Sequence, residues 1–480
     1  MMRNKRRPVL LINPLNEIEL IGKNFRAGFT YPPGGILLLA ACLEKEGFPV
    51  KIIDLLAEDY PNIDSLINEI KLFKPFCIGI TSTSPQIRGA VSLAKIIKEN
   101  FPEALLGIGG PHPSAYYEKL KEIPYFDFIF VGEGEISFPK ILMDLETKIP
   151  DDELYVDKKF VQKIYFGEPN SDLDSSPFQA RHLLKGKYRL LGVYEKFSTI
   201  HSGRGCPFNC VYCSSPIEKR RSYRARSVEN VIKEIDYCVN TLGSKFILFT
   251  DDTFTTNRQR IIDLCHEIIR RKIKFKFCCE TRVELVDEEL ARIMKKAGLV
   301  ELQFGVESGS ERIRKEVIHK NFSQAQLEGA YNLCKKLRIH SNAFIMMGFP
   351  SETKEDLLAT HKICLTLPVD IIGIHFTVIM PGSDLYDIAI KEKKLSDDYW
   401  NKYALGEALN QPLYIPDGIS KEFMEKLRLL TYKKFYFNPK FIFRRFIFDI
   451  KHFKALRDDF RVAITLLKQG NTGRGGDYGE

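Results

Sequence analysis

Three cysteines within eight positions of one loop are the residues of this chain best suited to chemistry. Cys206, Cys210 and Cys213 lie in the Gly- and Pro-containing run from Gly203 to Cys213. Thiolates select zinc, copper(I) or iron–sulfur clusters. A structural zinc would need a fourth protein ligand to close its tetrahedron, and no partner Cys-x-x-Cys is found. Three ligands instead leave one iron of a cluster open to a substrate or cosubstrate, which favours a catalytic cluster.

The three-cysteine spacing, with the aromatic Tyr212 just before the last cysteine, resembles the signature of the radical S-adenosylmethionine (SAM) superfamily. The resemblance implies a 4Fe-4S cluster whose open iron chelates the amino and carboxylate groups of SAM. One-electron reduction then cleaves the sulfonium to a deoxyadenosyl radical, so the cofactor supplies the difficult chemistry and the protein orients it.

Other positions resemble the cosubstrate contacts of this superfamily. Thr250, Asp251 and Asp252 stand where the superfamily often has a Gly-Gly-Glu segment that meets the amino group of SAM, and the departure leaves that contact open. Glu307 resembles the acceptor for the ribose hydroxyls, and Gly348 lies in a segment that resembles the adenine-side loop. The alternatives are a solvated glutamate at a strand end and a turn followed by a helix cap.

Six β-rich runs alternate with helical patterns around these motifs, as expected for a partial (βα)6 barrel of TIM-like type over residues 197–395. In such barrels the chemistry sits at the carboxyl ends of the strands. The predicted strands are Ser198–Ser202, Phe246–Thr250, Lys274–Glu280, Leu302–Val306, Ser341–Met347 and Ile371–Val378.

Residues 1–150 show a second α/β pattern, which predicts a doubly wound parallel sheet. Ligands of such sheets bind beyond the carboxyl ends of the strands. The predicted strands are Val9–Ile12, Val50–Asp54, Cys77–Thr81, Leu105–Gly109 and Phe128–Val131.

Small residues after these strands resemble the turns of the cobalamin-binding domain that precedes many radical SAM barrels. Glycine there lets the backbone approach a nucleotide tail closely. The resemblance implies cobalamin contacts at Ser82, Thr83, Gly109, Gly110 and His112. A cobalamin-free remnant used for interaction is the alternative.

The segment after the first strand departs from the family pattern. Cobalamin domains with a lower histidine ligand carry Asp-x-His-x-x-Gly there, whereas this chain has Asn13-Pro14-Leu15-Asn16. We therefore hypothesise that cobalamin is held without its lower base and without a protein imidazole, which favours methyl transfer to a radical.

The other eight cysteines are expected to be structural. Cys278 and Cys279 are adjacent in a predicted strand, so their side chains point to opposite faces and cannot both line the barrel. The remaining six lie in apolar patterns, as buried cysteines do. They are Cys42, Cys77, Cys238, Cys265, Cys334 and Cys364.

Composition and charge complete the domain prediction. The chain has 480 residues, 44% of them hydrophobic and 28% charged, and its early apolar stretches are too short to span a bilayer, so we expect a cytoplasmic enzyme. We predict a linker at residues 151–196, a helical C-terminal region at 396–469 and a disordered tail at 470–480.

Much of the net charge of +9 lies near the C-terminus, where 13 Lys or Arg and 5 Asp or Glu fall between Lys421 and Lys468, interleaved with aromatic residues. We favour a helix packed on the mouth of the barrel with a cationic outer face. The alternative is an interfacial helix on anionic lipid, that is, a peripheral membrane contact. A nucleic-acid partner would prefer a broader basic surface and is not expected.

Three functions are carried forward. The first is a cobalamin-dependent radical methyltransferase that acts on an unactivated carbon of an organic substrate and takes electrons from a flavodoxin or ferredoxin. The aromatic, cationic tail favours an amphiphilic substrate. The second is a cyclase or ring-rearranging enzyme like the anaerobic tetrapyrrole cyclases, which share this domain order. The third is a zinc-stabilised binding protein that uses its basic tail.

Overall fold

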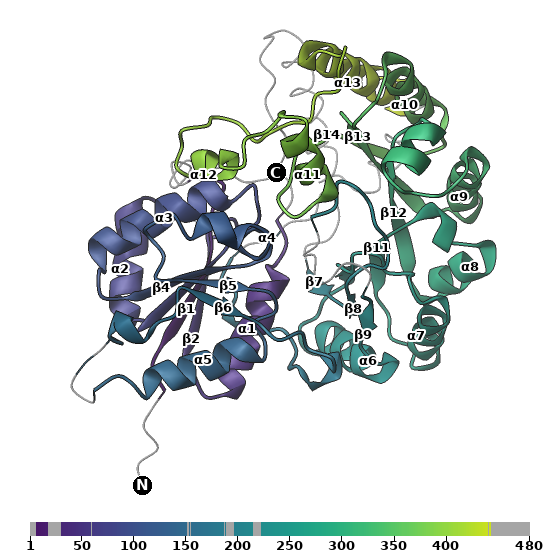
Figure 1. The fold of residues 1–480 in the computed structure, drawn as a ribbon. Coiled ribbons are helices and arrows are strands. Elements are labelled where there is room, and N and C mark those ends of the chain that lie inside the picture. The colour runs from purple at the N-terminus through teal and green to yellow at the C-terminus, as the bar shows by residue number, and fades with distance from the viewer. Residues whose placement is uncertain are drawn as a thin grey trace. The chain divides into compact units, whose positions relative to one another are not determined.

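A computed structural model describes residues 6–17, 30–58, 60–150, 153, 155–186, 188, 196–214, 222–439 and 441–442. The chain divides into two units. Unit 1 comprises Met1–Tyr188, Cys213–Arg224 and Ile379–Pro412, and unit 2 comprises Arg189–Tyr212, Ala225–Val378 and Leu413–Glu480. Each unit contains a six-stranded sheet in the part of the chain that is described (Figure 1).

The sheet of unit 1 is parallel and has the strand order β2-β1-β3-β4-β5-β6. The order reverses between β1 and β3, so the predicted doubly wound sheet is confirmed. Its strands are β1 (Val9–Asn13), β2 (Val50–Asp54), β3 (Cys77–Thr81), β4 (Leu105–Gly109), β5 (Phe128–Val131) and β6 (Ile164–Phe166). Its helices are α1 (Gly34–Lys45), α2 (Ile63–Phe73), α3 (Ile87–Asn100), α4 (Pro111–Leu120) and α5 (Ser137–Glu146), with short turns η2 (Lys158–Phe160), η3 (Leu173–Ser175) and η4 (Arg181–Leu183).

Besides Cys213–Arg224, unit 1 takes in two further segments that the sequence did not place there. Strand β6 comes from the region predicted to be only a linker and pairs with β5. Helices α11 (Asp384–Lys391) and α12 (Tyr399–Ala404) follow the second sheet in sequence, yet α12 packs on α3. Trp400 of α12 is fully buried and donates from Nε1 to the carbonyl of Ile379 at 3.1 Å. The predicted boundary at residue 395 therefore falls inside a segment that packs as one piece.

The sheet of unit 2 is also parallel and has the order β14-β13-β12-β11-β10-β7, as expected for six successive βα repeats. Its strands are β7 (Phe197–Ile200), β10 (Phe246–Phe249), β11 (Lys276–Thr281), β12 (Leu299–Glu307), β13 (His340–Met347) and β14 (Ile371–Phe376), and a separate pair is β8 (Gly203–Arg204) with β9 (Arg224–Ala225). Its helices are α6 (Val228–Asp236), α7 (Arg258–Arg270), α8 (Glu288–Ala297), α9 (Gln324–Leu337), α10 (Lys354–Thr366) and α13 (Lys421–Tyr436), with η6 (Tyr237–Thr241), η7 (Val283–Leu285) and η8 (Ile313–Val317).

Alternate residues of these strands face two different surroundings. Cys279 belongs to the large core between strands and helices, whereas Cys278 packs with Phe246 and Leu248 in a small cluster on the other face. The predicted opposite orientation of the two cysteines is confirmed. The six cysteines that we expected to be structural are also buried.

Helix α13 covers the edge strand β14. The Tyr432 hydroxyl accepts from the amide of Ile374 at 2.7 Å and donates to its carbonyl at 3.2 Å. One turn later, the Tyr436 hydroxyl makes the same pair of bonds to Ile372, at 3.3 and 2.8 Å. Two side chains thus bond backbone groups that would otherwise form an open sheet edge.

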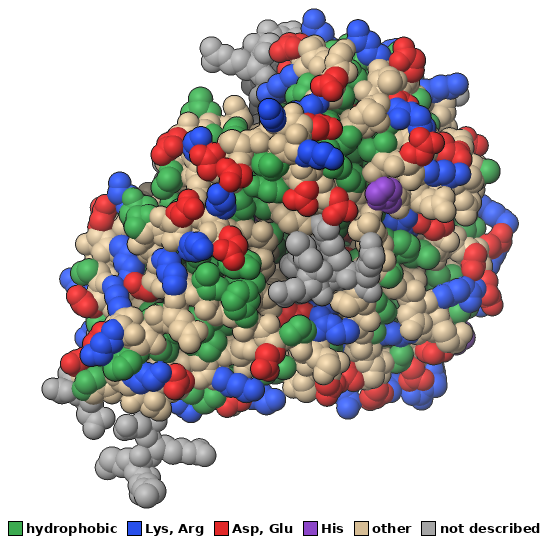
Figure 2. Space-filling model, in the orientation of Figure 1, with side chains coloured by type: hydrophobic (Ala, Val, Ile, Leu, Met, Phe, Trp, Pro, Cys, Tyr) green, Lys and Arg blue, Asp and Glu red, His purple; other side chains and the backbone are tan. Residues whose placement is uncertain are grey.

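A helix packed on the barrel was predicted at its mouth, whereas α13 packs against the edge strand β14 and against α10. The basic and aromatic sequence from residue 443 to 469, and the tail at 470–480, lie outside the described residues. Among the described helices, none is both long and apolar enough to cross a bilayer. On the face shown in Figure 2, Lys and Arg side chains are interspersed with Asp and Glu.

Candidate active site

The second half of the cysteine loop is held by hydrogen bonds to the segment that follows η8. Cys206, Cys210 and Cys213 are all half-buried. The amide of Val211 donates to the carbonyl of Ile318 at 3.2 Å. Nδ1 of His319 donates to the carbonyl of Asn209 at 3.2 Å, so the segment after η8 holds the loop in place.

The segment after β10 supports the start of this loop. The Asp251 carboxylate accepts from the backbone amide and the hydroxyl of Ser202, at 3.0 and 2.7 Å. Arg260 donates to the Ser202 carbonyl at 2.7 Å. Asp251 is 3% exposed, and burial raises its pKa to about 6. The structure therefore gives Asp251 a supporting position rather than an open one.

Of the three residues predicted to meet the cosubstrate here, Asp252 is the exposed one. Thr250 is half-buried, and its hydroxyl lies 3.0 Å from Nδ1 of His201. An amino group near this strand end would thus meet Asp252 before Asp251.

Glu307 stands at the end of β12 in an unusual backbone conformation. Its φ is +63°, and the pairing of β12 with β13 shifts register between Gly305 and Glu307. A non-glycine residue with φ above zero has a strained backbone, which persists only when the surrounding structure fixes it. Such residues cluster at functional sites. Here the Glu307 carboxylate accepts from the Tyr212 hydroxyl at 2.6 Å and from Lys320 Nζ at 2.7 Å. Two residues predicted from the family pattern, Tyr212 and Glu307, therefore meet.

Glu280 was not predicted as a site residue, although it lies near Asp252 and Glu307. It lies on β11 at an alternate position with Lys276 and Cys278, on the face opposite the large core. Burial raises the pKa of Glu280, and the carboxylates of Asp252 and Glu307 raise it further. The side chain is nevertheless exposed, so it lies near these carboxylates while remaining open to solvent. The alternation of β11 was the signal that could have identified it.

The turn after β13 is held by a buried carboxylate. Gly348 has φ of +102°, and a Cβ there would lie 2.4 Å from the carbonyl oxygen of Tyr414, so only glycine fits. Glu352 Oε2 accepts from the amides of Gly348 and Phe349, at 2.7 and 3.0 Å. Glu352 is 2% exposed, and burial raises its pKa to about 7.

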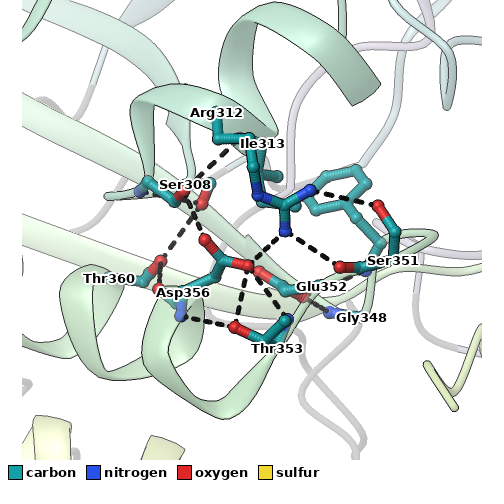
Figure 3. Close-up of polar contacts among 11 residues, drawn as sticks. Ser308, Arg312, Ile313, Gly348, Ser351, Glu352, Thr353, Asp356 and Thr360 are labelled. Atoms are coloured by element: carbon teal, nitrogen blue, oxygen red, sulfur yellow. Dashed lines mark hydrogen bonds and ion pairs between the residues drawn. The ribbon is translucent and has the colours of Figure 1, made fainter.

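A second carboxylate ties this turn to the segment after β12 (Figure 3). Asp356, in the first turn of α10, accepts from the Ser310 hydroxyl at 2.5 Å and from the amide of Thr353 at 3.0 Å. It also pairs with Arg312, which donates to the carbonyl of Ser351 at 2.9 Å. The two loops that carry Glu307 and Gly348 are therefore fixed to each other.

In unit 1 the predicted cobalamin-contact residues lie together. The amide of Ser82 donates to the carbonyl of Gly109 at 2.9 Å, and the amide of His112 donates to the carbonyl of Ser82 at 3.0 Å. Gly110 has φ of +104°, and a Cβ there would approach the Thr81 hydroxyl to 2.7 Å. Thr83 is exposed on the same turn, where its hydroxyl donates to Gln86 at 2.8 Å.

His112 is enclosed. It is 1% exposed, its Nδ1 lies 2.9 Å from the Ser84 hydroxyl, and its ring centroid is 5.4 Å from those of Tyr116 and Trp400. Burial lowers its pKa to about 3, so the imidazole is neutral. Its Nε2 has no hydrogen-bond partner among the described residues.

A polar network that the sequence did not reveal closes the carboxyl end of β1. Asn13 donates to Asp54 at 2.8 Å and accepts from Gln86 at 2.9 Å. Asn13 is 6% exposed, and Asp54 is fully buried with its pKa raised by that burial. Asn13 therefore binds neighbouring polar side chains here.

Comparison with known proteins connects the two units to two families. The profile of the radical SAM superfamily matches residues 200–364, and that of the B12 binding domain matches residues 24–142. An uncharacterized methyltransferase of Pyrococcus horikoshii is 34% identical over 446 residues, covering 91% of this chain and 95% of the relative. The chain belongs to the cobalamin-binding radical SAM enzymes.

Two more similarities bear on this radical SAM enzyme. The anaerobic magnesium-protoporphyrin IX monomethyl ester cyclase of Rubrivivax gelatinosus is 27% identical over 443 residues, covering 89% of this chain and 77% of the relative. The solved radical SAM methyltransferase TsrM of Kitasatospora setae superposes with a TM-score of 0.62 at 19% identity, over 81% of this chain and 75% of that one. The structural likeness confirms the fold alone.

The two domains imply a 4Fe-4S cluster, SAM and cobalamin as cofactors. The cysteine loop fits a cluster, because it offers three half-buried thiols and all three lie inside the matched radical SAM region. Among the described residues, no three His, Cys, Asp or Glu side chains converge as the ligands of one metal ion do. The three thiols would therefore bind a cluster rather than a single metal ion. Family membership also removes the ground for the zinc-stabilised binding protein.

The turns of unit 1 fit cobalamin in two respects. Gly109 and Gly110 keep the carboxyl end of β4 free of side chains. The buried Nε2 of His112 is a polar atom that still needs a partner. Residues 18–29, which follow the Asn13 segment, lie outside the described part of this enzyme.

Proposed function

We propose that this enzyme is a cobalamin-dependent methyltransferase that methylates an unactivated carbon. The observation that carries the proposal is the 34% identity to a methyltransferase over nearly the whole of both chains. The cyclase is less similar, at 27%. Family membership alone does not specify the reaction, because members of the family methylate or cyclise different substrates. The proposal specifies methylation.

The site residues divide into two groups in this proposal. Cys206, Cys210 and Cys213 would hold the cluster, and the bound cofactors would supply radical chemistry and a methyl group. Tyr212 and Glu307 form one wall of the SAM site, where the Glu307 carboxylate is already oriented by two donors.

Further contacts follow from where the remaining residues lie. The Gly348 turn would take the adenine side of SAM, and exposed Asp252 would take the amino group. In unit 1, Gly109 and Gly110 would let cobalamin approach the backbone closely, while the buried Ser82 would support this turn through its bonds to Gly109 and His112. His112 would contact cobalamin only through Nε2, because Nδ1 already has a partner in Ser84.

A cyclisation is the second candidate, supported by the tetrapyrrole cyclase among the relatives. The same site would generate the substrate radical, and cobalamin would serve a redox role. The two reactions differ in the fate of SAM. A methyltransferase leaves S-adenosylhomocysteine together with deoxyadenosine, whereas a cyclase has no need to transfer the methyl group.

This difference can be measured before the substrate is known. The protein is reconstituted without oxygen with iron, sulfide and cobalamin, supplied with reduced flavodoxin, and given SAM with a labelled methyl group. We expect S-adenosylhomocysteine that depends on cobalamin, with the label on the cobalamin. Protein reconstituted without cobalamin is the control. Deoxyadenosine without any S-adenosylhomocysteine would reject methylation and favour cyclisation.

A further inference from the structure

A buried arginine lies beside one of the three cysteines. Arg282 follows β11 directly and is 5% exposed. Its Nη1 donates to Sγ of Cys210 at 3.5 Å, and its Nε donates to Glu284 at 2.6 Å. Its guanidinium carbon lies 3.9 Å from the centroid of the Phe208 ring, which belongs to the cysteine loop.

These three contacts use different parts of one planar group. An N–H on one edge points to the Cys210 sulfur, Nε binds the Glu284 carboxylate, and the face of the guanidinium covers Phe208. Arginine can make such contacts together because its donors form a rigid fork and its face stacks on aromatic rings. The side chain therefore has one well-defined position relative to the loop.

We propose that Arg282 is a positioning residue that raises the reduction potential of the cluster through its bond to Cys210. The proposal concerns electron entry, so it goes beyond the proposed function and applies equally to methylation and to cyclisation.

The physical basis is electrostatic. Reduction adds negative charge to a cluster and its thiolates, and hydrogen bonds to the sulfurs are among the factors that set the potential. A positive donor on Cys210 stabilises the reduced form more than the oxidised form. Burial strengthens this effect because little water is present to screen it.

Glu284 must oppose the effect. Its carboxylate neutralises part of the Arg282 charge at 2.6 Å, and its side chain is 16% exposed. Removing the carboxylate should therefore raise the potential, whereas removing the guanidinium should lower it. A residue that only held the loop would not give shifts of opposite sign.

The test is a redox titration of the reconstituted cluster, followed by electron paramagnetic resonance without substrate. For Arg282→Met we expect the equilibrium of one-electron reduction to fall at least tenfold, which is a shift of about 59 mV to more negative potential. Glu284→Gln should shift the potential in the opposite direction. Arg282→Lys, which keeps the charge but not the fork, should lie between Arg282→Met and the wild type. Arg292→Met, on the exposed side of α8, is the matched control and should change nothing.

Each result bears on the proposal. An unchanged potential in Arg282→Met overturns it. If Arg282→Met binds no cluster, the Glu284→Gln variant decides the question, because it still contains Arg282. If the reduction potential of Glu284→Gln does not rise, Arg282 has only a structural role. The potential is read without methyl transfer, so failure of the proposed methylation would not affect the outcome.

Discussion

The buried carboxyl of Glu352 should make the stability of this enzyme depend on pH. Its two backbone partners, the amides of Gly348 and Phe349, both bond Oε2, while Oε1 has no hydrogen-bond partner among the described residues. Burial raises the pKa of Glu352 from 4.5 to about 7. The folded protein therefore binds this proton more tightly than the unfolded chain does.

The size of the effect follows from linkage. Each unit of pKa difference is about 1.4 kcal/mol, so Glu352 gives a pH-dependent stabilisation of roughly 3 kcal/mol. Because the pKa of the folded state is raised, this stabilisation is complete below pH 4.5 and is lost as the pH rises to about 7. The free energy of unfolding should thus fall across this window through Glu352.

The substitution Glu352→Gln removes the titration and keeps the shape of the side chain. We expect the stability of the variant relative to the wild type to improve by roughly 3 kcal/mol between pH 4.5 and 8, read from the midpoint of urea unfolding. Glu355→Gln removes an exposed carboxylate from the same turn and should show a much smaller change. A difference between Glu352→Gln and the wild type that stays constant over this range would refute the reasoning.

Four further substitutions test three other parts of the structure. Cys210→Ala should lose cluster iron and form no deoxyadenosine from SAM, and continued deoxyadenosine formation would contradict the cluster assignment. Lys320→Met leaves the buried Glu307 carboxylate without its cation and should cost about 3–5 kcal/mol in urea unfolding; an unchanged midpoint would show that the pair adds nothing. Tyr432→Phe and Tyr436→Phe should each cost about 1–2 kcal/mol and speed hydrogen exchange of the β14 amides. Equal exchange rates would mean that the hydroxyls do not protect this edge.

Much of both sheets could be predicted because parallel strands buried on both faces read as continuous apolar runs. The runs Cys77–Thr81 and Leu105–Gly109 are strands in the structure with the predicted bounds. The cysteine spacing and the glycine turns were equally local signals. Adjacent strands then brought Ser82 and Gly109 into contact, as the order of the sheet requires.

What the sequence did not reveal depends on partners far along the chain. Strand β6 has three residues, which is too short for a periodicity to appear. The motif at Thr250–Asp252 gave no sign that Asp251 turns to Ser202, 49 positions earlier. Arg282 becomes informative only when Cys210, 72 positions away, is seen beside it.

Unit 1 includes Ile379–Pro412, which is synthesised long after the rest of the unit, and this affects folding during translation. Ribosomes add about 5–20 residues per second, so the stretch between Tyr188 and Ile379 takes on the order of 10 to 40 s to synthesise. During that time the surface that Trp400 later covers, His112 included, is open to water and to chaperones. Trp400 is also the only tryptophan of the chain. Its fluorescence therefore reports the final closure of the first unit, a late step in the biogenesis of the enzyme.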